Sequence, residues 1–584
     1  MSLRNQVPDA EATYEDPVLG VNLSASPEDL QRGEAAKMQN LVHRGGLVTR
    51  EGSTLHTIIS AGSTTIVRGG HMFYYGSSKD RLVAYGTSIA NVEDNGTYAA
   101  ITTTMTSNKD TYFTTWPITE RVYISNGADP ILDYDGTNIA VAGATNIRSS
   151  AYSWTISTGG GTSTYYLRTS GGGDPGFSTP PAGVMLNGVV VAGGVATALT
   201  PGQWGYDDVD SLGYTTIYVR LADNADPDSK ASGFVQALAT LTLPGLNGWI
   251  DGQSQTIPAA RNIIGLSDRL FALTSDGIER CDPRDPTVWS WDSAWATFRP
   301  SQSGTFLSHI PHSVSSQSGE PLHGALAFTD SDYYFYTGTD FGDDVTNATA
   351  SQGEDSSIVH VAPIGIAAPK AVGNVPGVGT FFITNLKNVY FVPTGSVYGR
   401  IVGERISNRG GGPVDGIESM LLYDTNGDPY YSWVVYWEPY LMIGFCVDNA
   451  YPDTQYWLDL DKFRINPNAP IWYGPMKGQS PSVVWREDQR GGNQLMCGDG
   501  DPALGIYLYR LRVPDTYTDS RAAATNNIAC EYTTYLKSGG APSREKYVQQ
   551  IEVEMNEISG SATCDIADLS GTILSGLPVE RTFI

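Results

Sequence analysis

The chain has 584 residues, of which 40% are hydrophobic and 10% aromatic. This content excludes a disordered protein, because it is enough to bury a large core. Lys and Arg number 36 against 62 Asp and Glu, for a formal charge of −26. Such a chain repels DNA on average, which argues against a DNA-coating protein. It fits a surface past which DNA slides, and equally any acidic soluble protein.

No apolar run approaches the length of a membrane span, and the segment MSLRNQVPDAEATYEDP lacks the apolar core of a signal peptide. We therefore expect no membrane-spanning segment and synthesis in a cytoplasm. The five cysteines form no CxxC pair, so we expect buried free thiols and no zinc cluster. The 65 Gly among many Tyr, Thr and Val favour short strands joined by tight turns.

The segment Gly20–Gly52 opens the folded part of the chain. Alternation at Val21–Leu23 predicts the end of a strand. Ser26 and Pro27 predict a helix start, because serine caps free amides and proline fits the first helical position. Glu34–Val42 predicts a second short helix with its apolar residues on one face. A glycine break then leads to a strand predicted at Leu47–Arg50.

The opening pattern is G-x-N, S-P-x-x-L, G-E-A with an Asn shortly after, and G-G-L-x-x-R-x-G. It resembles the start of structural proteins of tailed bacteriophages, and is similar to the nozzle or hub (tail tubular) proteins of short phage tails, which are built on a β-propeller. The resemblance implies a homo-oligomeric ring, a hexamer, below the portal or its adaptor. The matching residues are Gly20, Asn22, Pro27, Leu30, Gly33, Glu34, Ala35, Asn40, Gly46, Leu47, Arg50 and Gly52.

Pairs of short strands follow at roughly the 40–50 residue spacing of propeller blades. The clearest pair is Arg121–Gly127 with Ile131–Gly136, whose Asn-Gly and Asp-Gly steps mark turns. Each unit has too few strands to close a core alone, so the sequence predicts an all-β, β-propeller-like array, with a string of sandwiches as the alternative. The other strand segments are Ile66–Gly76, Arg81–Gly86, Asn262–Leu273, Ala325–Phe328, Tyr333–Gly338, Thr380–Thr384, Val389–Val392, Ser432–Trp437, Tyr440–Val447, Tyr456–Leu460, Val483–Trp485, Leu495–Gly498 and Ile506–Leu511.

Residues 150–250 interrupt this spacing with Gly and Pro runs. The segments Trp204–Asp207 and Thr216–Leu221 predict a small β domain inserted between blades, and they resemble a module of phage tail and fibre proteins. Near the C-terminus we predict strands at Glu531–Leu536, Tyr547–Met555 and Ala562–Ile566, which either close the ring with the N-terminal strand or cap its end. The predicted domains are an extended arm (1–19), the opening motif with the first blades (20–149), the inserted β domain (150–250), the remaining blades (251–515) and a C-terminal β region (516–584).

Few residues are placed to carry chemistry. His309 and His312 are separated by Ile-Pro and have no acid at ligand spacing, so we expect no metal there. Gly171–Gly176 fits G-x-G-x-x-G, but its prolines leave no helix to follow, so we expect a loop. We interpret the acidic clusters as turns, with calcium sites or a glycosidase carboxylate pair as alternatives. These clusters are Asp282 with Asp285, Asp340 with Asp343 and Asp344, Asp459 with Asp461, and Asp499 with Asp501.

Arg400, Arg405 and Arg409, beside a Gly-rich run, are the best candidate for a basic contact patch that binds phosphate or an acidic partner, but a solvated loop is the favoured interpretation. The dense aromatic residues between Tyr430 and Tyr473 favour core packing, with a subunit interface or a sugar platform as alternatives. The sequence therefore assigns no catalytic, cofactor-binding or metal-binding residue.

We expect a non-enzymatic structural protein of a phage virion tail, whose ring retains the genome and then conducts double-stranded DNA without sequence-specific binding. Two alternatives stay open. One is a β-propeller that binds or degrades glycans, with carboxylates or aromatics converging at the propeller axis. The other is a capsid-bound or receptor-binding component of the virion.

Overall fold

The protein is described here from a computed structural model. Contacts divide the chain into two units, Tyr14–Tyr535 and a smaller one made of Met1–Thr13 with Leu536–Ile584. Among the described residues, none of the helices has the length and apolarity needed to span a bilayer. The structure describes residues 17–23, 30–102, 105–142, 144–146, 153–168, 181, 183–186, 189–211, 216–230, 234–238, 259–266, 268–274, 277–282, 284–290, 307–315, 321–337, 357–386, 388–396, 401, 403–407, 432–447, 449, 451–489, 492–522, 524–534, 563–568 and 571–578.

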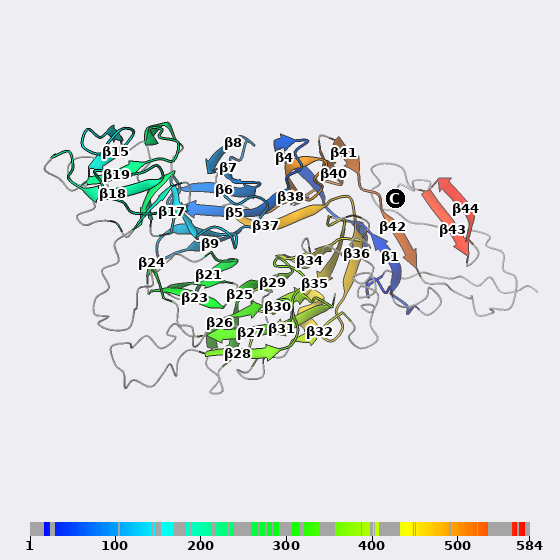
Figure 1. Cartoon of the computed structure of the whole chain (residues 1–584). Coiled ribbons are helices and arrows are strands. Elements are labelled where there is room, and N and C mark those ends of the chain that lie inside the picture. Colours follow the sequence, from blue (N-terminus) through cyan, green and yellow to red (C-terminus); the bar gives the residue numbers. More distant parts are fainter. Residues whose placement is uncertain are drawn as a thin grey trace, which may run out of the picture. The chain divides into compact units, whose positions relative to one another are not determined.

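Most of the larger unit consists of antiparallel sheets of four strands that follow one another in the chain, and we call these sheets blades (Figure 1). Blade 1 contains β5 (Val67–Tyr75), β6 (Ser78–Tyr85), β7 (Ser88–Val92) and β8 (Tyr98–Thr102). Blade 2 contains β9 (Tyr112–Trp116), β10 (Arg121–Ser125), β11 (Leu132–Tyr134) and β12 (Ile139–Val141). Blade 3 contains β21 (Asn262–Leu266), β22 (Arg269–Leu273), β23 (Ile278–Asp282) and β24 (Asp285–Ser290).

The next three blades repeat this plan. Blade 4 contains β25 (Ser308–Ser315), β26 (Pro321–Phe328), β27 (Tyr333–Thr337) and β28 (Ser357–Ala362). Blade 5 contains β29 (Val372–Val375), β30 (Gly379–Ile383), β31 (Val389–Pro393) and β32 (Glu404–Arg405). Blade 6 contains β33 (Trp433–Trp437), β34 (Tyr440–Phe445), β35 (Thr454–Asp459) and β36 (Trp472–Met476), with the short helix α2 (Leu460–Ile465) after β35.

Blade 7 combines the two ends of the propeller chain. Its strands β37 (Pro481–Gln489), β38 (Gly492–Asp499) and β39 (Gly505–Val513) are consecutive, but the fourth strand is β4 (Gly52–Ala61) from the N-terminal segment. The sheet continues through β40 (Thr518–Arg521) and β41 (Ala524–Asn527). β4 therefore lies between β39, to which it is antiparallel, and β40, to which it is parallel.

The first strand of each blade contacts the first strand of the next, and β37 of blade 7 contacts β5 of blade 1. In the described part of the chain, seven blades thus form a closed cycle, which is the β-propeller expected from the sequence. Three strands of blades 5 and 6, namely β30, β34 and β35, are buried at every position. A sheet with two apolar faces must be covered on both sides, and the ring supplies a neighbour for each face.

The core is correspondingly divided into clusters between neighbouring blades. Phe73 and Val122 belong to the cluster between blades 1 and 2, and Phe328 and Phe382 to that between blades 4 and 5. The cluster between blades 7 and 1 includes Trp485. The dense aromatic region of the sequence also lies here, since Trp433, Tyr440, Tyr456, Trp457, Trp472 and Tyr473 are all buried. Core packing of these residues, the favoured interpretation, is confirmed.

The N-terminal segment corrects one prediction. Glu34–Val42 is not a helix: it forms β1 (Ala35–Gln39) and β2 (Leu41–His43), and β2 pairs with β3 (Leu47–Thr49). The partner of β1 is β42 (Glu531–Thr534), close to the other end of the chain. That pairing and the burial of Ala35 and Met38 outweigh the local helix propensity of Ala, Lys, Met and Gln. The predicted helix start at Ser26 and Pro27 lies outside the described residues.

The insertion forms two four-stranded sheets between blades 2 and 3. Its core contains Trp154, Leu167, Val184, Ile217 and Val235, with members from both sheets. Its first strand pairs with its last. One sheet has the order β13 (Ala144–Asn146), β20 (Val235–Leu238), β16 (Gly183–Leu186), β17 (Val189–Val191), and the other β14 (Thr155–Ile156), β15 (Tyr165–Arg168), β19 (Thr216–Arg220), β18 (Gln203–Asp207). A 3₁₀ turn, η1 (Pro227–Ser229), precedes β20.

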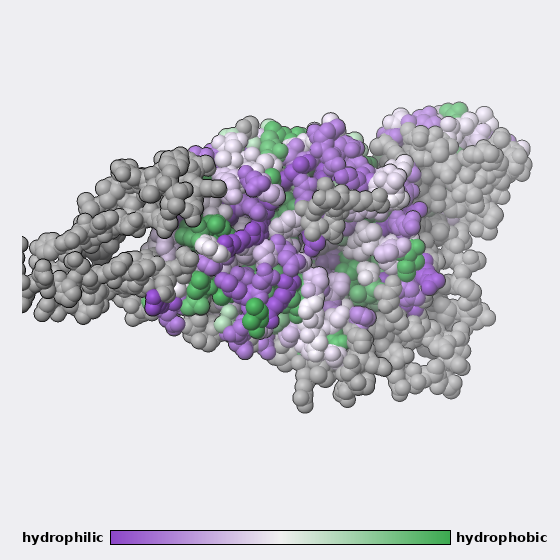
Figure 2. All heavy atoms as spheres, turned by 180° about the vertical axis from the view of Figure 1, so that it is seen from behind, coloured by the Kyte–Doolittle hydropathy of each residue, from purple (hydrophilic) through white to green (hydrophobic). Residues whose placement is uncertain are grey.

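The smaller unit contributes one described hairpin, β43 (Thr563–Asp568) with β44 (Gly571–Pro578), which includes most of the strand predicted at Ala562–Ile566. The strand predicted at Tyr547–Met555 lies outside the described residues. On the face of the molecule drawn in Figure 2, hydrophilic residues predominate and hydrophobic ones are scattered between them. Scattered exposed apolar residues are normal for a folded protein surface.

The tight contact between blades 7 and 1 gives a first prediction. A Cβ added at Gly498 on β38 would lie 2.2 Å from Val67 Cβ on β5, and Val67 is fully buried. We expect Gly498→Ala to lower the free energy of unfolding by about 1–3 kcal/mol, as overpacking does in other cores. Urea unfolding measures the change. Gly193→Ala is the control, because its nearest heavy atom is 3.7 Å away. Equal stability of both variants would contradict the contact.

Candidate functional site: closure of the propeller

The residues of the opening motif lie where the N-terminal segment joins the last blades. β1 contacts β36 of blade 6 and pairs with β42, and β4 then enters blade 7. Figure 1 shows the blue strand β4 beside the orange strand β40, which is more than 400 residues away in the sequence. The motif therefore marks the place at which the ring is closed.

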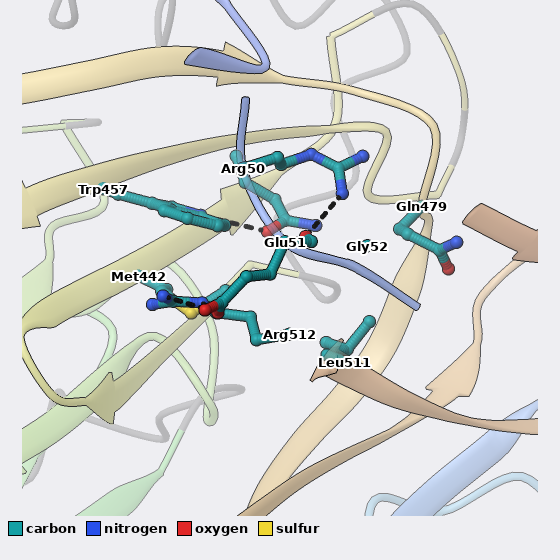
Figure 3. Close-up of a pocket in the computed structure, with 9 residues that line it drawn as sticks. Arg50, Glu51, Gly52, Met442, Trp457, Gln479, Leu511 and Arg512 are labelled. Atoms are coloured by element: carbon teal, nitrogen blue, oxygen red, sulfur yellow. Dashed lines mark hydrogen bonds and ion pairs between the residues drawn. The ribbon is translucent and has the colours of Figure 1, made fainter. Parts of the chain in front are cut away.

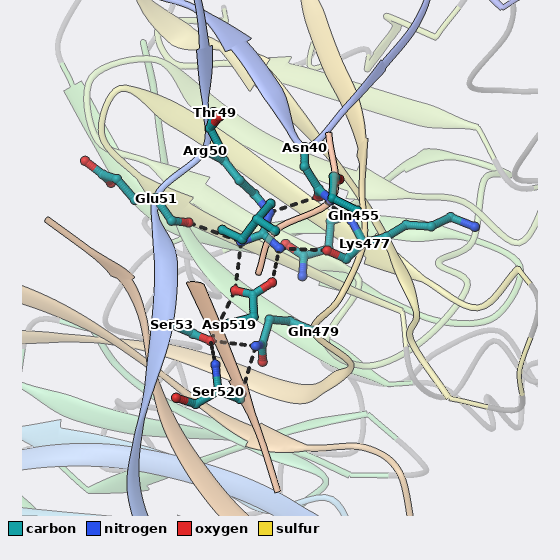
Figure 4. A network of polar contacts seen from close by, with 12 residues as sticks. Asn40, Thr49, Arg50, Glu51, Ser53, Gln455, Lys477, Gln479, Asp519 and Ser520 are labelled. Carbon is teal, nitrogen blue, oxygen red and sulfur yellow. Dashed lines mark hydrogen bonds and ion pairs between the residues drawn. The ribbon is translucent and has the colours of Figure 1, made fainter. Parts of the chain in front are cut away.

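Arg50 is the centre of this junction. Its Nη1 donates to Asp519 Oδ1 at 3.0 Å, and its Nη2 contacts Asp519 Oδ2 (Figure 4). Its Nε donates to Asn40 Oδ1 at 3.0 Å, and Nη2 also donates to the carbonyl of Lys477 at 2.7 Å. The Arg50 and Asp519 side chains are only 6% and 4% exposed. The bidentate pair links the segment between β3 and β4 to β40, and the bond to Lys477 links it to the end of blade 6.

The Asp519 carboxylate is held from a second side. Ser53 Oγ, on β4, lies 3.3 Å from Asp519 Oδ1 and accepts a hydrogen bond from the Ser520 amide at 3.2 Å. Gln479 Nε2 donates to Ser53 Oγ and to the Ser520 carbonyl. We call Asn40, Arg50, Ser53, Gln479 and Asp519 the closure network. A buried ion pair is stable only when its remaining hydrogen-bonding groups are satisfied, and these neighbours satisfy them.

Asn40 adopts the left-handed conformation (φ 57°), which Asn tolerates better than most residues. Its Nδ2 donates to the Ala529 carbonyl at 2.8 Å, and its Oδ1 accepts from the Lys477 amide at 2.8 Å. The Asn40 side chain thus joins β1 to the C-terminal segment and to blade 6. The helix predicted for Glu34–Val42 is incompatible with this conformation.

At two motif positions glycine is required, because the backbone of another segment lies too close for a Cβ atom. A Cβ at Gly52 would lie 2.0 Å from the Thr518 carbonyl oxygen, and one at Gly20 would lie 2.4 Å from the Trp472 carbonyl oxygen. Gly20 also has a positive φ of 77°. Asn22 Nδ2 donates to Glu34 Oε2 at 3.3 Å, which fixes the turn before β1. Gly33 and Gly46 lie in turns beside these contacts, and Pro27 is outside the described residues.

A second buried ion pair joins blades 7 and 1. Arg81 Nε and Nη2 on β6 donate to the Glu487 carboxylate on β37 at 2.7 and 2.8 Å. The two side chains are 1% and 0% exposed. His56 Nε2, on β4, lies 2.9 Å from Arg81 Nη1. Burial, followed by the charges of Arg81 and Arg510, lowers the pKa of His56 to about 4, so this imidazole is neutral at pH 7.

A small cavity adjoins the closure network (Figure 3). Its volume is about 10 Å³, which is room for a single water molecule. Arg512 lies in its wall, donates to Glu51 Oε2 from Nε and Nη2, and stacks over the rings of Tyr440 and Trp457. Burial lowers the pKa of the Arg512 guanidinium. The cavity is too small for a sugar or nucleotide, and its lining residues are Arg50, Glu51, Gly52, Met442, Gln455, Trp457, Gln479, Leu511 and Arg512.

The other residues singled out in the sequence lie apart from this junction. Arg405 is on β32, the last strand of blade 5, and its Nε lies 3.4 Å from Ser407 Oγ. Arg400 and Arg409 are outside the described residues, so the basic patch stays a prediction. His309 and His312 lie on β25, with the Tyr336 hydroxyl 2.7 Å from His309 Nδ1 and the Thr380 hydroxyl 2.9 Å from His312 Nδ1.

The described aspartates of the acidic clusters mainly contact residues that are near them in the sequence. Asp499 Oδ1 accepts from the Asp501 amide, and Asp459 caps α2 by accepting from the Lys462 amide. Asp282 and Asp285 pair across a bulge between β23 and β24. Asp340, Asp343 and Asp344 are outside the described residues. Within the described ranges, no group of three or more His, Cys, Asp or Glu residues is placed to hold a metal ion.

Sequence reasoning missed the distant residues that hold the junction. Asp519, Gln479 and Glu487 carry no local signal, because each acts on a residue more than 400 positions away.

No protein-family model and no curated protein matches the sequence. Solved structures to which the fold is similar include Ycf48 bound to a D1 peptide (8% identity, TM-score 0.31, covering 79% of this chain and 100% of that one). Another is the WD40 domain of SCAP from fission yeast (9%, TM-score 0.24, 47% and 62%). A third is an endosialidase of phage phi92 (11%, TM-score 0.29, 97% and 86%). The propeller assignment itself follows from the strand order and blade contacts of this chain.

The closure network gives a second prediction. Asp519→Ala leaves the Arg50 guanidinium buried without its carboxylate, so we expect a loss of about 3–5 kcal/mol in the free energy of unfolding. Glu531→Ala is the matched control in the same region, since it removes a pair with Lys37 whose side chains are 34% and 53% exposed. We expect that control to lose less than about 1 kcal/mol. Denaturant titration compares the two, and equal losses would show that Asp519 does not hold the junction.

The buried histidines give a third prediction, on pH. Burial lowers the pKa of His309 to about 3 from 6.5, so the folded state keeps it neutral while the unfolded chain takes up a proton below pH 6.5. The free energy of unfolding therefore falls as the pH is lowered from 6.5 towards 3, by about 1.4 kcal/mol per pH unit for this residue. We expect His309→Gln to flatten this slope by about that amount. An unchanged slope in His309→Gln would contradict this prediction.

Proposed function

We propose that the protein is a non-enzymatic structural subunit of a bacteriophage virion tail, a nozzle or hub protein. Copies of it form a ring, a hexamer as the resemblance implies, that binds the portal or its adaptor and other tail proteins. The ring retains packaged double-stranded DNA and then conducts it along its axis. The protein is made in the host cytoplasm and resides in the virion tail.

The role of the opening motif carries this proposal. Of the motif residues described, Asn22, Glu34, Asn40 and Arg50 make side-chain contacts that fasten the N-terminal segment, and Gly20 and Gly52 permit its close approach to blades 6 and 7. The residues that carry the resemblance are therefore engaged in holding one propeller shut. A subunit that bears the pressure of packaged DNA needs that mechanical property, which supports a structural role.

The charge of the chain supports the same role. With 36 basic against 62 acidic residues, a ring of these subunits presents a negative field to the phosphate backbone. Proteins that hold DNA release counterions through many Lys and Arg contacts, and this chain offers few in excess. DNA would pass such a surface with little adhesion, which is what a conduit requires.

A fourth prediction tests the assembly. We expect native mass spectrometry of the purified protein to show the mass of a ring of subunits. Alternatively, we expect imaging of purified particles to show a ring whose symmetry axis lies on the DNA path. The discriminating comparison is between free protein and particles, since some virion proteins assemble only on their neighbours. Monomers in both samples would overturn the proposal.

The glycan alternative is tested on the same material. A propeller that binds or degrades glycans should retain or cleave surface polysaccharide as an isolated chain, whereas a tail conduit should do neither. Binding or hydrolysis by the purified protein, abolished by boiling, would replace the structural proposal with the glycan one.

A further inference from the structure

The first strands of the blades surround the axis of the propeller. The separation of two blades can therefore be counted as the number of steps between them around the ring. Going round the ring, blade 5 is three steps from blade 1 (5 to 6, 6 to 7, 7 to 1) and three steps from blade 2 (2 to 3, 3 to 4, 4 to 5). In a ring of seven, no two blades are farther apart. A direct contact of blade 5 with blades 1 and 2 therefore crosses the axis.

Lys370 makes such a contact. It precedes β29 of blade 5, and its Nζ donates to the carbonyl of Arg68 on β5 at 2.5 Å and to Asp110 Oδ1, just before β9, at 2.9 Å. Arg68 Nη1 lies 3.8 Å from the same Asp110 oxygen. We call Arg68, Asp110 and Lys370 the axis contact. The three side chains are only 18%, 18% and 12% exposed, so the axis contact is largely shielded from solvent.

The backbone around the axis contact is fixed to the blades on both sides. The Thr111 amide donates to the Arg68 carbonyl at 3.2 Å, which joins blades 2 and 1. The Val434 amide donates to the Lys370 carbonyl at 3.0 Å, which joins blades 6 and 5. The lysine side chain is thus anchored at its base on one side of the ring and bonded at its tip on the other.

We propose that Lys370 is a latch across the propeller axis, which ties blade 5 to blades 1 and 2 and closes the centre of the ring against passage of a ligand. Neighbouring blades are held by apolar packing, whereas this contact couples blades that share no core cluster. The inference holds for the single propeller and does not depend on the proposed function. For that function it means that DNA runs between subunits, outside the axis of each propeller.

The charges of the axis contact are compensated only while all three of its residues are present. Burial lowers the pKa of Lys370, and the Asp110 carboxylate opposes that effect. Without Asp110, a buried ammonium beside the Arg68 guanidinium would be left with a carbonyl as its partner. Removing one member of a buried charged group is costly because the other charge stays desolvated. The contact therefore behaves as one unit, and this behaviour can be measured.

Hydrogen exchange with mass spectrometry on the full chain tests the latch. Lys370→Met keeps the apolar stem and removes the cation, and Asp110→Asn keeps the shape and removes the carboxylate. We expect either change to speed exchange about tenfold or more in peptides that cover the starts of β5 and β9, as well as β29, because the three strands lose a shared restraint. Lys79→Met is the control: its pair with Asp94 is on the surface, with side chains 36% and 53% exposed.

A double-variant cycle adds a second readout. If the contact acts across the axis, the losses of unfolding free energy in Lys370→Met and Asp110→Asn are not additive, and the double variant loses clearly less than their sum. Faster exchange confined to β29 in Lys370→Met, or additive losses in the cycle, would overturn the proposal. Either result would reduce Lys370 to a local residue of blade 5.

Discussion

The insertion of β4 between β39 and β40 is the constraint on which the rest of the structure depends. Every blade has two apolar faces, and a linear row of blades would leave one face of the first and one face of the last open to water. β4 completes blade 7 with a strand from the other end of the chain, so blade 7 can pack on blade 1. The clusters that include Trp433 and Trp485 both rely on that closure.

The closure of the ring would open more easily if backbone hydrogen bonds alone held β4 in blade 7. The Arg50–Asp519 and Arg81–Glu487 pairs give it a second kind of bond, buried and directional. Such pairs add little net stability over apolar contacts of the same volume, but separating their partners is unfavourable. Their value here is in fixing which strands meet, because a register slip at β4 would leave the charges of Arg50 and Asp519 buried without partners.

Most blade strands could be predicted from the sequence, whereas joining of the two chain ends was only one of two alternatives, and the partners within it could not be predicted. Hairpins such as β10 with β11 are local: alternation and an adjacent turn specify both strands. β1 has its partner, β42, near the opposite end of the chain, and a window around Ala35 sees only good helix formers. The helix predicted there was wrong for this reason. The buried aromatics of blade 6 were predicted well, because large rings in alternating strands have few other places to go.

In the candidate site too, the sequence could identify some of the residues but not others. Asn40 and Arg50 were identified through resemblance alone, and nothing near them in the sequence pointed to Asp519 or Gln479. Lys370 was not singled out at all, since an isolated lysine before a strand is ordinary. Its significance arises only from the ring, which brings Arg68 and Asp110 to it. The basic patch around Arg405 stays a prediction, because Arg400 and Arg409 lie outside the described residues.

The insertion between blades 2 and 3 has a consequence for how such a protein changes over evolutionary time. Ala144 on its first strand pairs with Leu238 on its last, so the polypeptide enters and leaves the module at neighbouring points. The cluster that joins blades 2 and 3 is built from Trp116, Tyr123, Ile263 and their neighbours, and it includes none of the module's described residues. A lineage can therefore exchange or lose this module, and with it whatever the module touches, while inheriting the ring unchanged.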